Sequence, residues 1–122
     1  MVVSAPAPDG GRNNSPYRSK QDLSACRSHL LELMQCVNFG RIEHLSIIGG
    51  EPILDPRPVV VREHKFGGEN GPRPEIDAAD FLLKQQVVEL FAFFDELQDD
   101  IIDVLEIKHG LPFRMIVTEV PA

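Results

Sequence analysis

Near the start of the chain, apolar residues recur at spacings of three and four, which is typical of one face of an amphipathic helix. This face consists of Leu23, Cys26, Leu30, Leu33 and Val37, widened by Leu31 and Met34. Ser19 followed by Asp22 resembles a capping box, with a carboxylate near the positive end of the helix dipole. Asn38 and Gly40 tolerate the left-handed backbone at which helices end. We therefore predict a helix from near Ser19 to about Val37.

After this helix the apolar period shortens toward two, which indicates a strand. Leu45 and Ile47 are expected on one face of the strand, and Ile42 and Ile48 on the other. The Gly49-Gly50 pair follows, and both glycines adopt positive φ angles without steric cost. The pattern predicts a β-hairpin directly after the first helix.

The return strand of this hairpin is interrupted by prolines. It starts at Pro52 and Ile53, but Asp55-Pro56-Arg57-Pro58 removes two backbone donors and restricts the residue before each proline. Val59 resumes a strand that we expect to run to about Phe66. A strand with such an interruption belongs at a sheet edge, because a central strand uses its backbone donors on both sides.

A second helix is predicted after a loop rich in glycine and proline. Residues 67–74 hold three glycines, two prolines and an asparagine, which is typical of a loop. Glu75, Asp77 and Asp80 then place negative charge at the start of a helix that runs to about Leu97. The helix is apolar over so wide an arc that it is either central or meets another subunit. The residues expected at such an interface are Phe81, Val88, Phe91 and Phe93.

One stretch of the chain occurs twice. Residues 42–53 recur at 102–113, a spacing of sixty, with Ile, Leu, Ile, Gly and Pro in register. The helix residues 30–34 are echoed by 87–91 at a spacing of fifty-seven. The two spacings predict that about three residues are inserted between helix and strand in the second copy.

The second copy ends with its own hairpin. Its strands are expected at Ile101–Lys108 and Pro112–Val120, joined by a His109-Gly110 turn. We therefore predict an α+β domain built as a tandem helix-plus-β-hairpin repeat, in which both helices pack on one face of an antiparallel sheet. The first copy spans residues 19–66, the linker 67–74 and the second copy 75–122.

The order of features in residues 30–66 points to one family. Leu30-Leu31-Glu32-Leu33 precedes Val37-Asn38-Phe39-Gly40-Arg41-Ile42, and a strand, a glycine turn and a further strand end at Arg62-Glu63-His64-Lys65-Phe66. This region resembles the short YezD-like bacterial proteins, which have a helix, an aromatic-Gly step, a strand, an acid-Gly turn and a strand with a basic end. The resemblance implies a helix–hairpin unit and a bacterial source. It implies no activity, because the family has no known function.

Composition narrows the class of protein. The 122 residues are 43% hydrophobic and 25% charged, which fits one small globular domain. Residues 1–18 are rich in proline, glycine and asparagine, so we expect a disordered N-terminal tail before a single domain at 19–122. No stretch has the length of a transmembrane helix and no secretory signal is recognisable, so we expect a cytoplasmic protein.

Charge is uneven along the chain. The net charge is −7, and residues 62–122 hold thirteen acids against six bases. This balance disfavours broad binding to a phosphate backbone, which needs clustered Lys and Arg. Nucleic-acid or nucleotide binding stays an alternative through the basic residues that flank the proline segment and loop, which are Arg57, Arg62, Lys65 and Arg73. The loop itself offers Gly67, Gly68 and Asn70 as further binding residues.

The remaining candidate sites are weaker. Cys26, His29, His44 and His64 can be imagined as a zinc site, but Cys26 belongs to the apolar face of its helix, so we expect no metal and no cofactor. The acidic cluster around Asp95–Asp103 is expected to be solvated surface. An enzyme with His44 or His64 as a base in a cleft between the two copies is a further alternative. The leading hypothesis is a non-enzymatic protein-interaction module that forms homodimers through the aromatic second helix or a free sheet edge.

Overall fold

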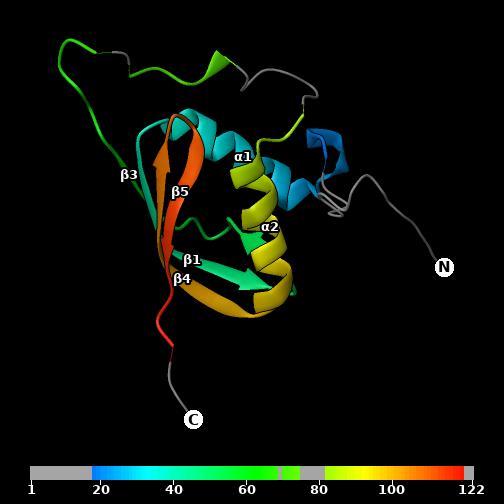
Figure 1. The fold of residues 1–122 in the computed structure, drawn as a ribbon. Helices are drawn as coiled ribbons and strands as arrows, with labels where there is room; N and C mark the ends of the chain where they lie inside the picture. The colour runs from blue at the N-terminus through cyan, green and yellow to red at the C-terminus, as the bar shows by residue number, and fades with distance from the viewer. Residues whose placement is uncertain (1–17, 69, 75–81, 120–122) are drawn as a thin grey trace.

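The structure of the protein is a computed structural model that describes residues 18–68, 70–74 and 82–119. It is an α+β fold with two helices and an open sheet of five strands whose pairs are antiparallel. The helices are α1 (Ala25–Val37) and α2 (Gln85–Leu97). The strands are β1 (Gly40–Ile48), β2 (Glu51–Ile53), β3 (Val59–Arg62), β4 (Asp100–Lys108) and β5 (Leu111–Ile116). Figure 1 shows α1 above β1 and β4, α2 in front of the end of β1, and β5 upright beside them.

The first helix begins later than the sequence predicts. Ser19 and Asp22 do form a capping box, but it caps only the short 3₁₀ helix η2 (Lys20–Asp22). Leu23 then has extended backbone angles, and α1 starts after Ser24, whose side chain accepts a hydrogen bond from the Arg27 N–H. The capping box is therefore present, but the predicted start of the α-helix near Ser19 is wrong, because Ser24 caps α1. The predicted helix end is confirmed, since Asn38 caps α1 with a φ of 65°.

β1 departs from simple alternation in its middle. His44 has a φ of 60°, so the strand bends there, and Ile42 is buried on the same side as Leu45 and Ile47. The prediction that Ile42 shares a face with Ile48 was therefore wrong. When one residue of a strand leaves the extended conformation, the side chains after it change faces relative to those before it.

The interrupted return strand lies at a sheet edge, as predicted. β2 pairs with the end of β1 and β3 pairs with its beginning, so both occupy the same side of β1. The segment between them contains the prolines and a cis peptide bond at Asp55–Pro56. β3 ends at Arg62, four residues before the predicted limit.

α2 also starts later than predicted. Its N-cap is Lys84, which has extended backbone angles, and Leu82 forms an isolated bridge with Ser19. The predicted acidic helix start at 75–81 lies outside the described residues, as does the predicted tail except for Arg18. The second hairpin is present, with the final strand ending at Ile116 instead of Val120.

The core lies between the two helices and one side of the central strand pair. β1 and β4 pair antiparallel, so that Ile42 lies opposite Leu105 and Leu45 lies opposite Ile102. These four residues are fully buried, and they pack in one cluster with apolar residues of both helices. The cluster includes Leu30, Met34, Phe91 and Phe94. β1 and β4 therefore form the centre of the fold.

The helices and strands of the two halves follow the same spacing. Two residues, Asn38 and Phe39, separate α1 from β1, and two residues, Gln98 and Asp99, separate α2 from β4. Both α-helices have 13 residues, and their bounds differ by sixty positions, as do those of β1 and β4. The predicted insertion of three residues between helix and strand is therefore wrong. The match of residues 30–34 to 87–91 at a spacing of fifty-seven paired helix positions that are three residues out of register.

Candidate functional site

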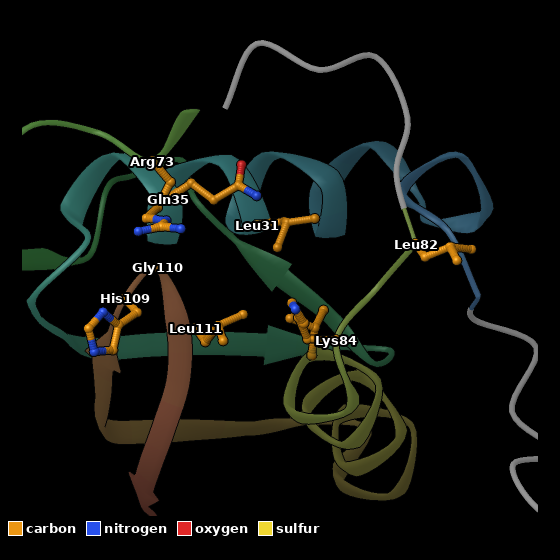
Figure 2. A pocket seen from close by; sticks show the side chains of 9 residues that line it. Leu31, Gln35, Arg73, Leu82, Lys84, His109, Gly110 and Leu111 are labelled. Carbon is orange, nitrogen blue, oxygen red and sulfur yellow. The ribbon is translucent and has the colours of Figure 1, made fainter. Parts of the chain in front are cut away.

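One cavity lies where the two halves of the chain meet (Figure 2) and is called the main cavity here, although a separate cavity beside α1 has a similar volume of about 410 Å³. Its volume is about 400 Å³. Leu31 and Gln35 of α1 form one wall, and Val87 of α2 and Leu111 of β5 form another. The remaining lining residues are Arg73, Leu82, Lys84, His109 and Gly110. Figure 2 shows Arg73 and Leu31 approaching from the side of α1, and Lys84 and Leu111 from the opposite side. A volume of this size is typical of small-molecule sites.

The loop before the cavity is attached to the end of α1. The Arg73 N–H donates to the Gln35 carbonyl oxygen at 3.0 Å, and the Asn38 side chain donates to the Gly71 carbonyl oxygen at 3.0 Å. The Gly110 N–H donates to the Asn38 carbonyl oxygen at 2.9 Å, which fixes the β4–β5 turn to the same helix end. These backbone contacts hold Arg73 and His109 at the mouth of the cavity.

A buried arginine occupies the opposite junction between the halves. Arg27 is 3% exposed, and its Nη2 donates to the Gly50 carbonyl oxygen and to Asp95 Oδ1, each at 2.6 Å. Its guanidinium also lies 5.4 Å from the centroid of the Phe91 ring. Sequence reasoning missed this residue. The sequence did contain an indication of its burial, because Arg27 lies one helical turn before the apolar residues Leu30 and Leu31.

A second, shallower groove runs along the outer side of β5. It has a volume of about 280 Å³ and lies between α2 and β5. Its apolar lining includes Leu90 and Phe93 of α2 and Phe113 and Met115 of β5. Phe113 is the extra residue at a bulge, because Arg114 pairs with Glu106 and Pro112 pairs with Ile107. The Phe113 side chain is 56% exposed, and the Lys108 ammonium lies 4.2 Å from the centroid of its ring.

The predicted interface residues divide between core and surface. Val88 is 6% exposed and Phe91 is fully buried, so neither lies on a contact surface of this fold. Phe93 is 39% exposed and lines the groove beside β5. Phe81 lies outside the described residues. The sequence left open whether this helix is central or meets another subunit. In the structure one face of α2 is buried, and that face includes Phe91 and Phe94.

The predicted basic residues do not form one cluster. Arg62 donates to the Cys36 carbonyl oxygen at 3.3 Å, and the Lys65 ammonium lies 4.1 Å from the Phe39 ring centroid. Arg57 lines a separate cavity beside α1 that includes His29 and Cys36, whereas Arg73 lines the main cavity. The structure therefore brings only Arg73 of this set into the main cavity.

The described residues of the glycine-rich loop are held by hydrogen bonds to the backbone of Lys65. Asn70 closes the loop on itself, since its Oδ1 accepts from the Lys65 N–H at 2.7 Å and its Nδ2 donates to the Lys65 carbonyl oxygen at 2.8 Å. Gly67 has a φ of 80° at this turn, and the Gly68 N–H also donates to Lys65. The asparagine and glycines thus have a conformational role here.

The histidines and cysteines are dispersed. Cys26 is exposed and Cys36 is half-buried, and both are free thiols. His44 is exposed at the bend of β1, and the His64 ring packs edge-on against Phe66 at 5.2 Å. Within residues 18–68, 70–74 and 82–119, no group of three or more His, Cys, Asp or Glu side chains is arranged to hold a metal ion. His109, which the sequence indicated only as a turn residue, is the histidine that lines the main cavity.

Several acids of the predicted solvated cluster have bonding partners. Asp95 binds Arg27, and Asp99 Oδ1 accepts from the Gly49 N–H at 2.7 Å. Asp103 accepts a hydrogen bond from the Thr118 hydroxyl. The acids near the end of α2 therefore hold the first hairpin turn, in addition to carrying negative charge.

Neither helix in the described part of the chain has the length and apolar character required to cross a membrane.

Comparison with known proteins gives no match to a protein-family model, a curated protein or a solved structure. The similarity of residues 30–66 to YezD-like proteins therefore stays a prediction.

Proposed function

We propose that the chain is a tandem pair of one helix–hairpin unit and that it works as a self-associating protein-interaction module. The first part of this proposal is supported by the common spacing of sixty residues between α1 and α2 and between β1 and β4. It is also supported by burial, because the third, sixth and eighth residues of both β1 and β4 are the buried ones. A shared bend in the middle of both strands accounts for this common departure from alternation.

Reciprocal hydrogen bonds between the halves support the same proposal. The Gly50 N–H donates to the Gln98 carbonyl oxygen at 2.8 Å, and the Gly110 N–H donates to the Asn38 carbonyl oxygen at 2.9 Å. Each hairpin turn thus contacts the residue that caps the helix of the other half. Two identical subunits related by a two-fold axis make pairs of contacts of this kind. These contacts are consistent with a chain in which two helix–hairpin units are joined covalently and pack like the two subunits of a dimer.

The contact surface we propose is the β5 edge with its adjoining groove. Among the described residues, β5 pairs only with β4, so its other edge has no strand partner. Phe113 and Ile116 on β5 are 56% and 46% exposed, and Phe93 lies across the groove on α2. An unpaired edge beside exposed apolar side chains is a template for strand addition. This combination is the observation that carries the proposal.

The opposite edge of the sheet is unsuited to the same contact. β2 and β3 are three and four residues long, and they are separated by a segment that contains Pro56 and Pro58. Short strands and prolines are devices that protect a sheet edge. Association through one open edge is isologous, with β5 pairing antiparallel to β5 of a second copy, and it closes at a dimer.

Sedimentation equilibrium of the full chain tests this function. We expect a dimer of the 13.6 kDa chain, and we expect Phe113→Asp to shift the equilibrium to monomer by at least about tenfold, because a carboxylate would be placed in the apolar contact. Phe66→Asp is the matched control, since Phe66 is almost fully exposed in a loop away from β5. A wild-type chain that stays monomeric, or an equal effect of both substitutions, would exclude the proposed surface.

A further inference from the structure

Alternation along β4 decides which of its peptide groups face β5. In an antiparallel pair, opposed residues alternate between those that exchange two backbone hydrogen bonds and those that exchange none. Lys108 and Leu111 flank the two-residue turn, so they form a pair of the first kind. Glu106 and Val104 lie two and four residues before Lys108 in β4, and they therefore also direct their peptide groups at β5.

The pairing partners of these residues show which part of β5 faces the open edge. Arg114 pairs with Glu106 and Ile116 pairs with Val104, so both direct their peptide groups at β4. Met115 lies between them and directs its N–H and carbonyl group away from β4. In the regular part of β5 that follows the bulge, Met115 is therefore the residue through which a second strand forms backbone hydrogen bonds.

A two-fold axis between two β5 strands leaves few possible registers. Edge-facing residues have to meet edge-facing residues, so in the regular part of the strand the axis lies beside Arg114, Met115 or Ile116. An axis beside Arg114 places the two guanidinium groups in a directly opposed pair whose Cα atoms are about 4.5 Å apart, and like charges there are destabilising. An axis beside Ile116 extends the pairing as far beyond the end of β5 as into it. Met115 is the position that avoids both costs.

We propose that the axis of the dimer passes beside Met115 and that Arg114 determines this register. Arg114 of each copy then lies opposite Ile116 of the other, so the two guanidinium groups are kept apart and each aliphatic stem packs on an apolar side chain. Phe113 of one copy comes opposite Val117 of the other, which pairs the 56% exposed ring with a residue that packs against the core. This register rests on the proposed self-association and specifies its contacts.

Isotope-filtered NOE spectra of the wild-type chain report the register directly. Equal amounts of isotope-labelled and unlabelled full chain are mixed, so that the filtered spectrum shows only contacts between copies. We expect a strong contact between the Hα protons of Arg114 and Ile116, because an opposed pair without hydrogen bonds brings its Cα atoms to about 4.5 Å. A strong contact of the Arg114 Hα with its own counterpart, or of the Ile116 Hα with its own counterpart, would overturn the proposed register.

A matched pair of substitutions at Ile116 tests the role of Arg114. Ile116→Glu places a carboxylate opposite Arg114 of the second copy, twice in each dimer, whereas Ile116→Lys places an ammonium group there. We expect the Glu variant to dimerise at least about fivefold more tightly than the Lys variant in sedimentation equilibrium. The net charge of −7 favours the reverse order, because the Glu variant is the more negative chain. Adding Arg114→Gln to both variants is expected to abolish the advantage of the Glu variant.

Failure of the register and failure of self-association give different results. A wild-type chain that stays monomeric would exclude the self-association and with it the register. A wild-type dimer would overturn the register alone if the Lys variant associates as tightly as the Glu variant, or if neither variant associates. Each variant is first compared with the wild type by its amide spectrum at low concentration, which reports the fold independently of association.

Discussion

Arg27 of α1 and Asp95 of α2 form the ion pair that joins the two helices, with Nη2 and Oδ1 2.6 Å apart. The pair is asymmetric, because the Arg27 side chain is almost fully buried whereas that of Asp95 is about half-exposed. The guanidinium also donates to the Gly50 carbonyl oxygen through Nε and Nη2. Arg27 therefore connects the first helix, the first hairpin turn and the second helix at one point.

Replacing Arg27 tests how much this connection contributes to stability. We expect Arg27→Met to lower the free energy of unfolding by about 2–3 kcal/mol, because the Gly50 carbonyl oxygen loses its buried donor while Asp95 is still hydrated. Urea unfolding followed by circular dichroism measures the change. Arg41→Met is the control, since the Arg41–Glu43 pair is also 2.6 Å but lies on the surface, and it is expected to cost less than about 1 kcal/mol. Equal losses for both variants would contradict the proposed importance of Arg27.

Gly40 is the glycine with the strictest steric requirement. It has a φ of 156°, and a Cβ there would clash with the Val61 carbonyl oxygen of β3. We expect Gly40→Ala to destabilise the fold by at least about 2–3 kcal/mol, because β1 and β3 would have to separate. Gly49→Ala adds a Cβ that meets no atom within 4 Å, so only its φ of 58° opposes the change, at about 1 kcal/mol. Thermal unfolding compares the two, and a larger loss for Gly49→Ala would contradict the packing of β3 on β1.

Asp22 is expected to give a pH dependence to the start of the fold. Backbone N–H groups of Ser19 and Arg18 donate to its carboxylate and lower its pKa below the ordinary value. A lowered pKa in the folded state means that the contribution to stability is complete above the ordinary carboxyl pKa and is lost as the pH falls through the lowered value. An NMR titration of the Asp22 carboxyl carbon measures this pKa. Titration at or above the ordinary value would show that the capping box does not persist in solution.

The order of elements was readable from the sequence because the local signals were strong. The Gly49-Gly50 and His109-Gly110 turns, the end of α1 at Asn38 and the edge position of the proline segment each follow from residue types with restricted or unusual backbone preferences. Helix starts were less well predicted. Ser19 and Ser24 are both N-cap residues, and the two extended residues Leu23 and Ser24 separate the short 3₁₀ helix from α1.

Long-range contacts explain what the sequence could not indicate. The face that Ile42 occupies depends on the bend at His44, which a count of alternating residues does not reveal. The main cavity depends on Lys84 and Leu111 meeting Leu31 across the two halves, and these residues are far apart in the chain. Charge patterns likewise placed Arg62, Lys65 and Arg73 together, whereas the fold gives each a different neighbour.

Amide hydrogen exchange of β5 tests the proposed self-association most directly, because it reports the unpaired strand edge itself. The edge strand β3 serves as the internal reference in the same spectrum. The account predicts that exchange of those amides among Leu111 and Phe113–Ile116 that face the unpaired edge slows by about tenfold or more as protein concentration rises from about 10 μM to about 1 mM, while Val59–Arg62 exchange is unchanged. Exchange of the β5 amides that is independent of concentration, in a chain that is otherwise folded, would contradict it.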